Sequence, residues 1–284
     1  MPLQLVEDAF GDARNAQFLC VASDLAYLPQ DQGGPAYQEL LGLEAVLFSV
    51  GNTQAFEAHN NDHIVVAFRG TESPTTIDGL KDWLVTNAAN FLILPEGRMG
   101  TDFAAAGVGA RFHQGFINAI ADIWDPVFEK IQAERTKSDR PLWLTGHSLG
   151  GALALLAAWL FQRKFVPVHQ IYTFGGPMVG NDQAAAAINK AYPNKVFRYV
   201  DRIDPIPRLP TVSLADNEFI HCECEVGLGT AQGISSAAEQ LRELAGQAVS
   251  GLINATIAED IWKAVQSRLN AHSLENYKQR IASL

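Results

Sequence analysis

Residues 141–160 read Pro141-Leu-Trp-Leu-Thr-Gly-His-Ser-Leu-Gly-Gly-Ala-Leu-Ala-Leu-Leu-Ala-Ala-Trp-Leu160, and this stretch decides the fold. Residues 142–145 form a short apolar run typical of a strand, and the Ala- and Leu-rich part from 152 to 163 predicts a buried helix. Between them the sequence fits G-x-S-x-G. A strand that turns directly into a helix strains the residue at the tip, and side chains two positions either side would collide. The pattern predicts a nucleophile elbow that exposes the Ser148 hydroxyl.

G-x-S-x-G alone also occurs by chance, and its ordinary interpretation is a Gly-rich turn. The strand before it and the helix after it favour the elbow. At the start of that helix the backbone N–H of Leu149 would point to the same spot as the Ser148 hydroxyl. It would then be ready to stabilise an oxyanion.

The composition is that of a folded protein with an acidic surface. The chain has 284 residues, of which 48% are hydrophobic and 18% charged, and its formal net charge is −10. This charge argues against nucleic acid and against electrostatic docking on anionic membranes, although a neutral lipid or ester remains open as substrate. No apolar run approaches ~18 residues, so we expect no membrane span. The N-terminus lacks the blocks of a secretory signal, which indicates a cytoplasmic chain or a mature secreted one.

Ahead of the elbow, periodicity predicts a helix over 7–27, a Gly/Pro loop over 30–37 and three strands in an antiparallel meander, at 45–50, 53–58 and 63–69. The third strand ends in Gly70-Thr71. This dipeptide is either an ordinary turn or a source of a backbone N–H and a hydroxyl for the active site. Residues 94–111 show little periodicity and predict a long surface loop.

From 116 to 200 the order is helix, strand, helix, strand, helix, strand, with Pro126 expected to kink or split the first helix. Such alternation predicts parallel strands with chemistry at their carboxyl ends. Residues 218–226 alternate like one strand that turns Cys222 and Cys224 toward the core, and further helices are expected over 234–270. No linker separates domains, so the prediction is one α/β domain over 1–284.

Ser148 needs an imidazole base, and the base needs a carboxylate to fix its tautomer. Asp204 follows a predicted strand and precedes the rigid Pro205-Ile-Pro207 turn, so we prefer it to Asp201, which we interpret as a surface or ion-pair residue. Of seven histidines, His221 and His272 follow the elbow in suitable positions. Position favours His272 but does not exclude His221.

The separated motifs together resemble the class 3 lipases, the fungal-type triacylglycerol lipase family with its plant phospholipase and galactolipase relatives. The motifs that carry the resemblance are Val66-Ala-Phe-Arg-Gly-Thr71, His113-Gln-Gly-Phe116, Thr145-Gly-His-Ser-Leu-Gly-Gly-Ala152, Thr173-Phe-Gly-Gly-Pro-Met-Val-Gly-Asn181, Val200-x-x-x-Asp204-Pro-Ile-Pro207 and His272-x-x-x-x-Tyr277. They span about residues 65 to 277. The resemblance implies an α/β-hydrolase fold with a mostly parallel central sheet, an antiparallel N-terminal meander and helices on both faces.

Carried over by position, the resemblance implies Ser148 as nucleophile, Asp204 as acid and His272, in place of His221, as base. Thr71 and Leu149 would supply the oxyanion hole, and a lid is implied at about 73–82. The chain departs from the fungal pattern in two ways. It lacks cysteines suited to disulfides, and it has more helix between Asp204 and His272.

These residues predict a serine carboxylic-ester hydrolase, with triacylglycerol lipase as the leading hypothesis, lipid or another apolar ester as substrate and transient contact with a lipid interface. A phospholipase A1 or galactolipase, or a non-lipid esterase of the feruloyl-esterase kind, is the alternative. A non-catalytic binding protein on the same fold is a more remote one. We expect no cofactor and no metal. The Gly-rich segment 227–233 lacks the following parallel strand of a dinucleotide site, and His221-Cys-Glu-Cys224 is interpreted as a strand whose His and Cys side chains face opposite sides.

Overall fold

The computed structural model describes residues 3–71, 92–93, 99–209, 219–229, 263 and 266–284. The expected lid at 73–82 and nearly all of the expected helices at 234–270 lie outside these residues. No described helix is long and apolar enough to cross a membrane.

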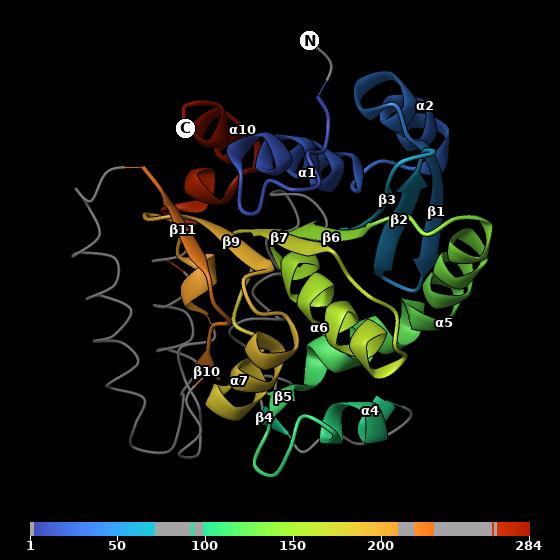
Figure 1. The fold of residues 1–284 in the computed structure, drawn as a ribbon. Helices are drawn as coiled ribbons and strands as arrows, with labels where there is room; N and C mark the ends of the chain where they lie inside the picture. Colours follow the sequence, from blue (N-terminus) through green and yellow to red (C-terminus); the bar gives the residue numbers. More distant parts are fainter. Residues whose placement is uncertain (1–2, 72–91, 94–98, 210–218, 230–262, 264–265) are drawn as a thin grey trace.

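A seven-stranded sheet lies at the centre of the molecule with helices on both faces (Figure 1). In spatial order its strands are β1 (Glu44–Val50), β2 (Thr53–His59), β3 (Ile64–Phe68), β6 (Leu142–His147), β7 (Gln170–Phe174), β9 (Val196–Asp201) and β11 (Glu225–Leu228). The first three pair antiparallel, and all the pairs from β3 to β11 are parallel. Both the meander and the parallel half predicted from the sequence are therefore confirmed.

The helices divide into two layers. One face carries α1 (Ala13–Leu25), α2 (Gln30–Leu41) and α10 (Leu274–Ala282), and the other carries α5 (Gln114–Lys137), α6 (Leu149–Arg163) and α7 (Asp182–Ala191) (Figure 1). A smaller sheet, which the sequence did not predict, has the order β10 (Phe219–Ile220), β8 (Gly180–Asn181), β5 (Phe112–His113) and β4 (Leu92–Ile93). Short helical segments are α4 (Gly100–Ala104), η4 (Ile206–Arg208) and η5 (Leu269–His272).

The apolar strand preceding Ser148 is buried on both faces. Leu142 and Leu144 of β6 join the core under α5 and α6, whereas Trp143 joins the core under α1 and α10. Side chains of a strand alternate between faces, so a strand covered on both sides needs an apolar residue at nearly every position. This requirement explains the continuous apolar run that the sequence shows before the elbow.

The predicted loop at 30–37 is wrong, because α2 spans these residues with Pro35 inside it. Two contacts outweigh the poor helix propensity of Gly and Pro. A Cβ at Gly33 would lie 2.4 Å from Phe56, so glycine lets the helix approach β2 closely. Tyr37 is fully buried, and its hydroxyl donates to the Ala22 carbonyl oxygen at 2.6 Å.

Within the predicted loop 94–111, the described residues include α4, so the loop prediction is wrong there. Phe103 is fully buried, and the Trp159 indole N–H donates to the Asp102 carbonyl oxygen at 2.9 Å. These tertiary contacts support a single helical turn that has no periodic signal. The helix with Pro126 is one continuous α5, not two.

The single strand predicted over 218–226 is also wrong. The chain pairs with β8 as β10, leaves the small sheet, and joins the edge of the large sheet as β11. Cys222 is buried but Cys224 is exposed, so the two thiols do not share a core face. The Arg198 guanidinium, which donates through Nε to the Cys222 carbonyl oxygen, occupies the crossing between the sheets.

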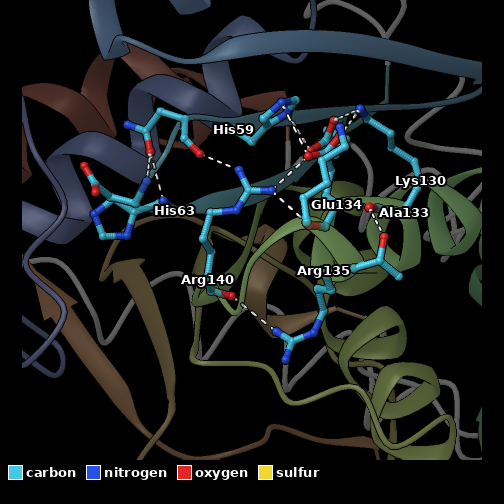
Figure 2. A network of polar contacts seen from close by, with 12 residues as sticks. His59, His63, Lys130, Ala133, Glu134, Arg135 and Arg140 are labelled. Carbon is cyan, nitrogen blue, oxygen red and sulfur yellow. Dashed lines mark hydrogen bonds and ion pairs between the residues drawn. The ribbon is translucent and has the colours of Figure 1, made fainter.

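A buried charged cluster ties α5 to the meander, away from the elbow (Figure 2). Figure 2 shows Glu134 facing Lys130 and Arg140, which donate to its carboxylate at 2.6 and 2.8 Å. Lys137 adds a third hydrogen bond at 2.8 Å. Burial alone would raise the pKa of Glu134, but these three donors outweigh it and hold the pKa well below its usual range.

Candidate active site

Ser148 sits at the tight turn from β6 to α6, with φ of 56° and ψ of −130°. A positive φ is rare for a residue with a side chain, and here the packing around the turn enforces it. A Cβ at Gly146 would lie 2.2 Å from the Gly150 backbone, and a Cβ at Gly150 would lie 2.0 Å from the Phe68 carbonyl oxygen. The two glycines of G-x-S-x-G therefore allow the turn to close against the end of β3.

Asp204 and His272 meet although 68 positions separate them. His272 Nδ1 lies 2.7 Å from Asp204 Oδ2, and both side chains are buried. The other carboxylate oxygen, Oδ1, accepts from the Ile206 N–H at 2.9 Å. Since a carboxylate only accepts, Nδ1 carries the hydrogen and Nε2 of neutral His272 is left with a lone pair. Among the described residues, this buried Nε2 has no hydrogen-bond partner.

Two glycines after β7 connect this pair to the elbow. A Cβ at Gly175 would lie 2.8 Å from Asp204 Oδ2 and 3.0 Å from His272 Cε1. The next residue, Gly176, would place a Cβ 3.7 Å from the Ser148 carbonyl oxygen. Asp204, His272 and the strained Ser148 therefore surround one loop at the carboxyl ends of β6, β7 and β9.

The two residues expected to hold an oxyanion flank this position. Thr71 follows Gly70 at the end of β3, and a Cβ at Gly70 would lie 3.1 Å from Ser148 Cβ. The Thr71 hydroxyl is buried with no hydrogen-bond partner in the described part of the chain. Leu149 is the first residue of α6, where backbone N–H groups have no acceptor within the helix. Both residues thus carry donors next to the serine.

Asp201 has a different role from that of Asp204. Its carboxylate is buried, pairs with Arg280 at 2.6 Å and accepts from the Asn276 amide at 2.6 Å. Both partners lie on α10, which begins two residues after His272. The interpretation of Asp201 as an ion-pair residue agrees with this geometry, although the residue is not on the surface. It fastens the helix that follows the candidate base.

Tyr277 has a contact that the sequence did not reveal. Its hydroxyl donates to Asp204 Oδ2 at 2.7 Å and accepts from the Asp201 N–H at 3.1 Å. The only sequence signal was the tyrosine in the segment that resembles the family motif around His272, and it carried no role.

His147, the residue before the serine, packs its ring against His272 with ring centroids 4.5 Å apart. Its Nε2 lies 2.7 Å from the His272 carbonyl oxygen, and its Nδ1 lies 2.9 Å from the Tyr27 hydroxyl. Burial first, and the neighbouring His272 second, hold the pKa of His147 well below its usual range. His147 is therefore a neutral group that contacts His272.

His221, the alternative base, forms a hydrogen bond through Nε2 to the Pro207 carbonyl oxygen. Burial lowers its pKa to about 3, with the nearby Arg198 adding to the effect. This histidine supports the turn after Asp204, and the Asp204 carboxylate contacts His272 instead. Within the described residues, no group of three or more His, Cys, Asp or Glu side chains is arranged to hold a metal ion.

Comparison with known proteins places these features in a family. The family described as Lipase (class 3) matches residues 65–214. The chloroplastic phospholipase A(1) DAD1 of Arabidopsis thaliana is 32% identical over 164 residues, which are 55% of this chain and 35% of that protein. The secreted mono- and diacylglycerol lipase MDL3 of Malassezia globosa is 28% identical over 186 residues, 63% of this chain and 59% of that protein. This chain thus spans about a third to three fifths of the curated relatives it matches.

Among solved structures, lipase II from Rhizopus niveus superposes with a TM-score of 0.62 at 23% identity, covering 76% of this chain and 79% of that one. At this identity the likeness concerns the fold. It agrees with the α/β-hydrolase architecture that the sequence predicted.

Proposed function

The chain belongs to the class 3 lipase family, and on that premise we propose that it is a serine carboxylic-ester hydrolase that acts on acylglycerols, triacylglycerol first among them. One observation carries the proposal. His272 is fixed to Asp204 through Nδ1, and its Nε2 is buried without a partner among the described residues, beside a serine in a strained turn. A structural histidine would have both nitrogens satisfied, whereas a general base needs one lone pair available.

In the proposed reaction, His272 Nε2 removes the hydroxyl proton of Ser148 while the serine oxygen attacks the ester carbonyl carbon. His272 becomes a cation, which the Asp204 carboxylate stabilises through the hydrogen on Nδ1. The carbonyl oxygen becomes an oxyanion, and the backbone N–H groups of Thr71 and Leu149, with the Thr71 hydroxyl, donate to it. His272 then gives its proton to the leaving alcohol, and the serine keeps the acyl group.

Hydrolysis of the acyl-enzyme repeats these steps with water as the nucleophile. His272 takes a proton from water, the hydroxide attacks the acyl carbon, and the serine leaves with that proton as the fatty acid is released. Asp204 keeps its charge throughout and holds one tautomer of the imidazole. No redox step is required, so the residues named suffice.

A second substrate class has a specific observation in its favour. The Arabidopsis relative with 32% identity is named a phospholipase A(1). The acyl ester bond of a phospholipid is chemically the same as that of an acylglycerol. Phospholipid or galactolipid is therefore the second candidate substrate, with a soluble non-lipid ester such as a feruloyl ester as a third. The candidates differ in the alcohol part of the ester, since the acyl transfer at Ser148 would be the same for all of them.

The test is hydrolysis of p-nitrophenyl esters from acetyl to palmitoyl by wild type and Ser148→Ala, below and above the aggregation point of each substrate. We expect a rate that rises with chain length and falls by about 10⁴-fold or more in the variant. Tributyrin, phosphatidylcholine and digalactosyldiacylglycerol in parallel assays then rank the head groups.

Labelling with an organophosphonate ester supplies the control, since it modifies only an activated serine. Wild type should be labelled at Ser148 and the variant should not. Full activity in Ser148→Ala would contradict the assignment of the nucleophile. A folded wild type that neither turns over esters nor reacts with the phosphonate would favour a binding protein on the same fold.

A further inference from the structure

We infer that the Tyr27 hydroxyl is a positioning group that links the oxyanion loop at Gly70 to the main chain of the base, His272, through His147. The inference rests on the proposed function, because it assigns a role within the same site. Tyr27 lies in the turn after α1, more than forty residues before the first segment that the sequence associated with catalysis. Nothing in its local sequence marks it as part of the site.

Hydrogen-bond directions along this connection are fixed by chemistry. The His272 carbonyl oxygen only accepts, so His147 Nε2, at 2.7 Å, carries the hydrogen. Neutral His147 then has a lone pair on Nδ1, and the Tyr27 hydroxyl at 2.9 Å must donate to it. Tyr27 therefore selects the tautomer of His147 that holds the backbone of His272 in place.

The oxygen of Tyr27 also contacts the oxyanion side of the site. Burial raises the pKa of Tyr27, and Arg69 and the Gly70 backbone partly oppose this effect. A Cβ at Gly70 would lie 2.2 Å from the Tyr27 hydroxyl and 2.7 Å from the His147 carbonyl oxygen. Glycine at position 70 thus lets the hydroxyl approach the residue immediately before Thr71.

The contact between Tyr27 and His147 also bears on the charge that His272 acquires during the reaction. His272 becomes a cation when it takes the serine proton, and the His147 ring lies 4.5 Å away. A proton on His147 Nδ1 would add a like charge at that distance, but the Tyr27 hydroxyl already occupies this nitrogen. The rings that face His147 are those of His272, Tyr27 and Tyr277, at centroid distances of 4.5, 6.1 and 6.0 Å. Burial and the neighbouring His272 disfavour a charge on His147, and the Tyr27 hydroxyl, by donating to Nδ1, pairs with the neutral form.

The position of His272 in the chain makes it depend on the hydrogen bond from His147 to its carbonyl oxygen. His272 ends η5, a turn of four residues, so its own element fixes its main chain weakly. The carbonyl oxygen that His147 holds belongs to the residue whose ring must reach the serine. A displacement of that main chain moves Nε2 directly, and a misplacement on the scale of 1 Å costs about 10- to 100-fold in rate.

Tyr27→Phe tests the inference, with Tyr37→Phe as the matched control. Tyr37 is a buried tyrosine on the same face of the sheet as the half-buried Tyr27, and its hydroxyl donates to the Ala22 carbonyl oxygen, outside the site. Both variants lose one hydrogen bond, so both should unfold about 2–4 °C lower than wild type. We measure kcat and KM on p-nitrophenyl butyrate at 25 °C, counting active sites by phosphonate titration.

We expect Tyr27→Phe to lower kcat per titrated site about 10- to 100-fold with KM within about twofold, and Tyr37→Phe to leave both unchanged. His147→Gln, whose amide N–H still reaches the His272 carbonyl oxygen, should retain more activity than His147→Leu. Wild-type kcat in Tyr27→Phe, or an equal loss in Tyr37→Phe, would overturn the inference and leave the proposed function standing. An inert wild type would remove the proposed function, and the inference with it.

Discussion

The hydroxyl group of Tyr277 donates to the Asp204 carboxylate at 2.7 Å, although 73 positions separate the two residues. It reaches Oδ2, the same oxygen that faces His272 Nδ1. One carboxylate oxygen thus receives two hydrogens, one from the candidate base and one from the helix that follows it. The other oxygen accepts from the Ile206 N–H, so both oxygens of the Asp204 carboxylate are held.

Tyr277→Phe should reduce both stability and turnover. The change leaves the buried Asp201 N–H without its acceptor and removes one donor from Asp204. Loss of a buried hydrogen bond of this kind costs about 1–3 kcal/mol of unfolding free energy, and we expect kcat to fall about tenfold. Urea denaturation and ester kinetics measure the two effects. Unchanged kcat in a destabilised variant would restrict Tyr277 to a structural role.

Asp204→Asn should abolish most of the activity without unfolding the protein. Every neighbour of this carboxylate donates to it: the Ile206 N–H on one oxygen, and Tyr277 and His272 on the other. An amide N–H₂ facing His272 turns its Nδ1 into an acceptor, so Nε2 then carries the hydrogen and cannot take the serine proton. We expect a loss of about 10³- to 10⁴-fold in kcat.

Asp201→Asn is the matched control for that variant. Its carboxylate is also buried and lies three residues earlier, but it contacts Arg280 and Asn276 and not the base. We expect a lower unfolding temperature and less than about a tenfold loss of kcat. Equal losses in the two variants would mean that Asp204 has no special role in the choice of tautomer.

Gly150→Ala should prevent the elbow from closing. The added Cβ would lie 2.0 Å from the Phe68 carbonyl oxygen, a main-chain atom inside the sheet that cannot move aside. We expect a loss of about 3 kcal/mol or more in unfolding free energy, measured by guanidinium denaturation. Gly176→Ala, where the nearest atom to the new Cβ is at 3.5 Å, should cost much less. Similar stabilities for the two variants would show that the turn tolerates a side chain.

Glu57→Gln should stabilise the protein more at high pH than at low pH. Glu57 is fully buried with Oε2 3.6 Å from Lys130 Nζ, and burial, partly offset by Lys130, raises its pKa from 4.5 to about 7. The folded state therefore holds a proton that the unfolded state has released between these values, and stability falls as the pH rises through this window. Glutamine removes that loss and keeps a hydrogen-bonding group beside His59 Nδ1, which lies 3.0 Å from Glu57 Oε1.

We expect the stability difference between Glu57→Gln and wild type to be about 2.5 kcal/mol larger at pH 8 than at pH 5, from urea denaturation at both values. Glu129→Gln changes an exposed residue of α5, so its stability should differ from that of wild type by the same small amount at pH 5 and at pH 8. A pH-independent difference for Glu57→Gln would contradict the raised pKa.

Elements with a local or periodic signal in the sequence are predicted correctly. The three meander strands, the parallel strands at β6, β7 and β9 and the helix over 182–191 all follow from periodicity and turn residues, and the structure places them as predicted. Elements whose weak local preferences are overridden by tertiary contacts are not predicted. Gly33 and Pro35 indicate a loop, but contacts with Phe56 and the burial of Tyr37 stabilise a helix there. The change of sheet at 221–224 has no signal in the local sequence.

The sequence by itself determined the elbow, because the sterics of a strand-to-helix turn leave only glycine at 146 and 150 and place Ser148 at its tip. It also determined the parallel sheet, because strands buried on both faces need continuous apolar runs. Position in the sequence left His221 open beside His272, the resemblance favoured His272, and the tertiary structure places His272 against Asp204. Only the tertiary structure decided that Tyr277 contacts Asp204 and that Tyr27 contacts His147. Those contacts join positions 68 to 125 residues apart. Such pairings depend on how the whole chain packs, and no local pattern of residues encodes them.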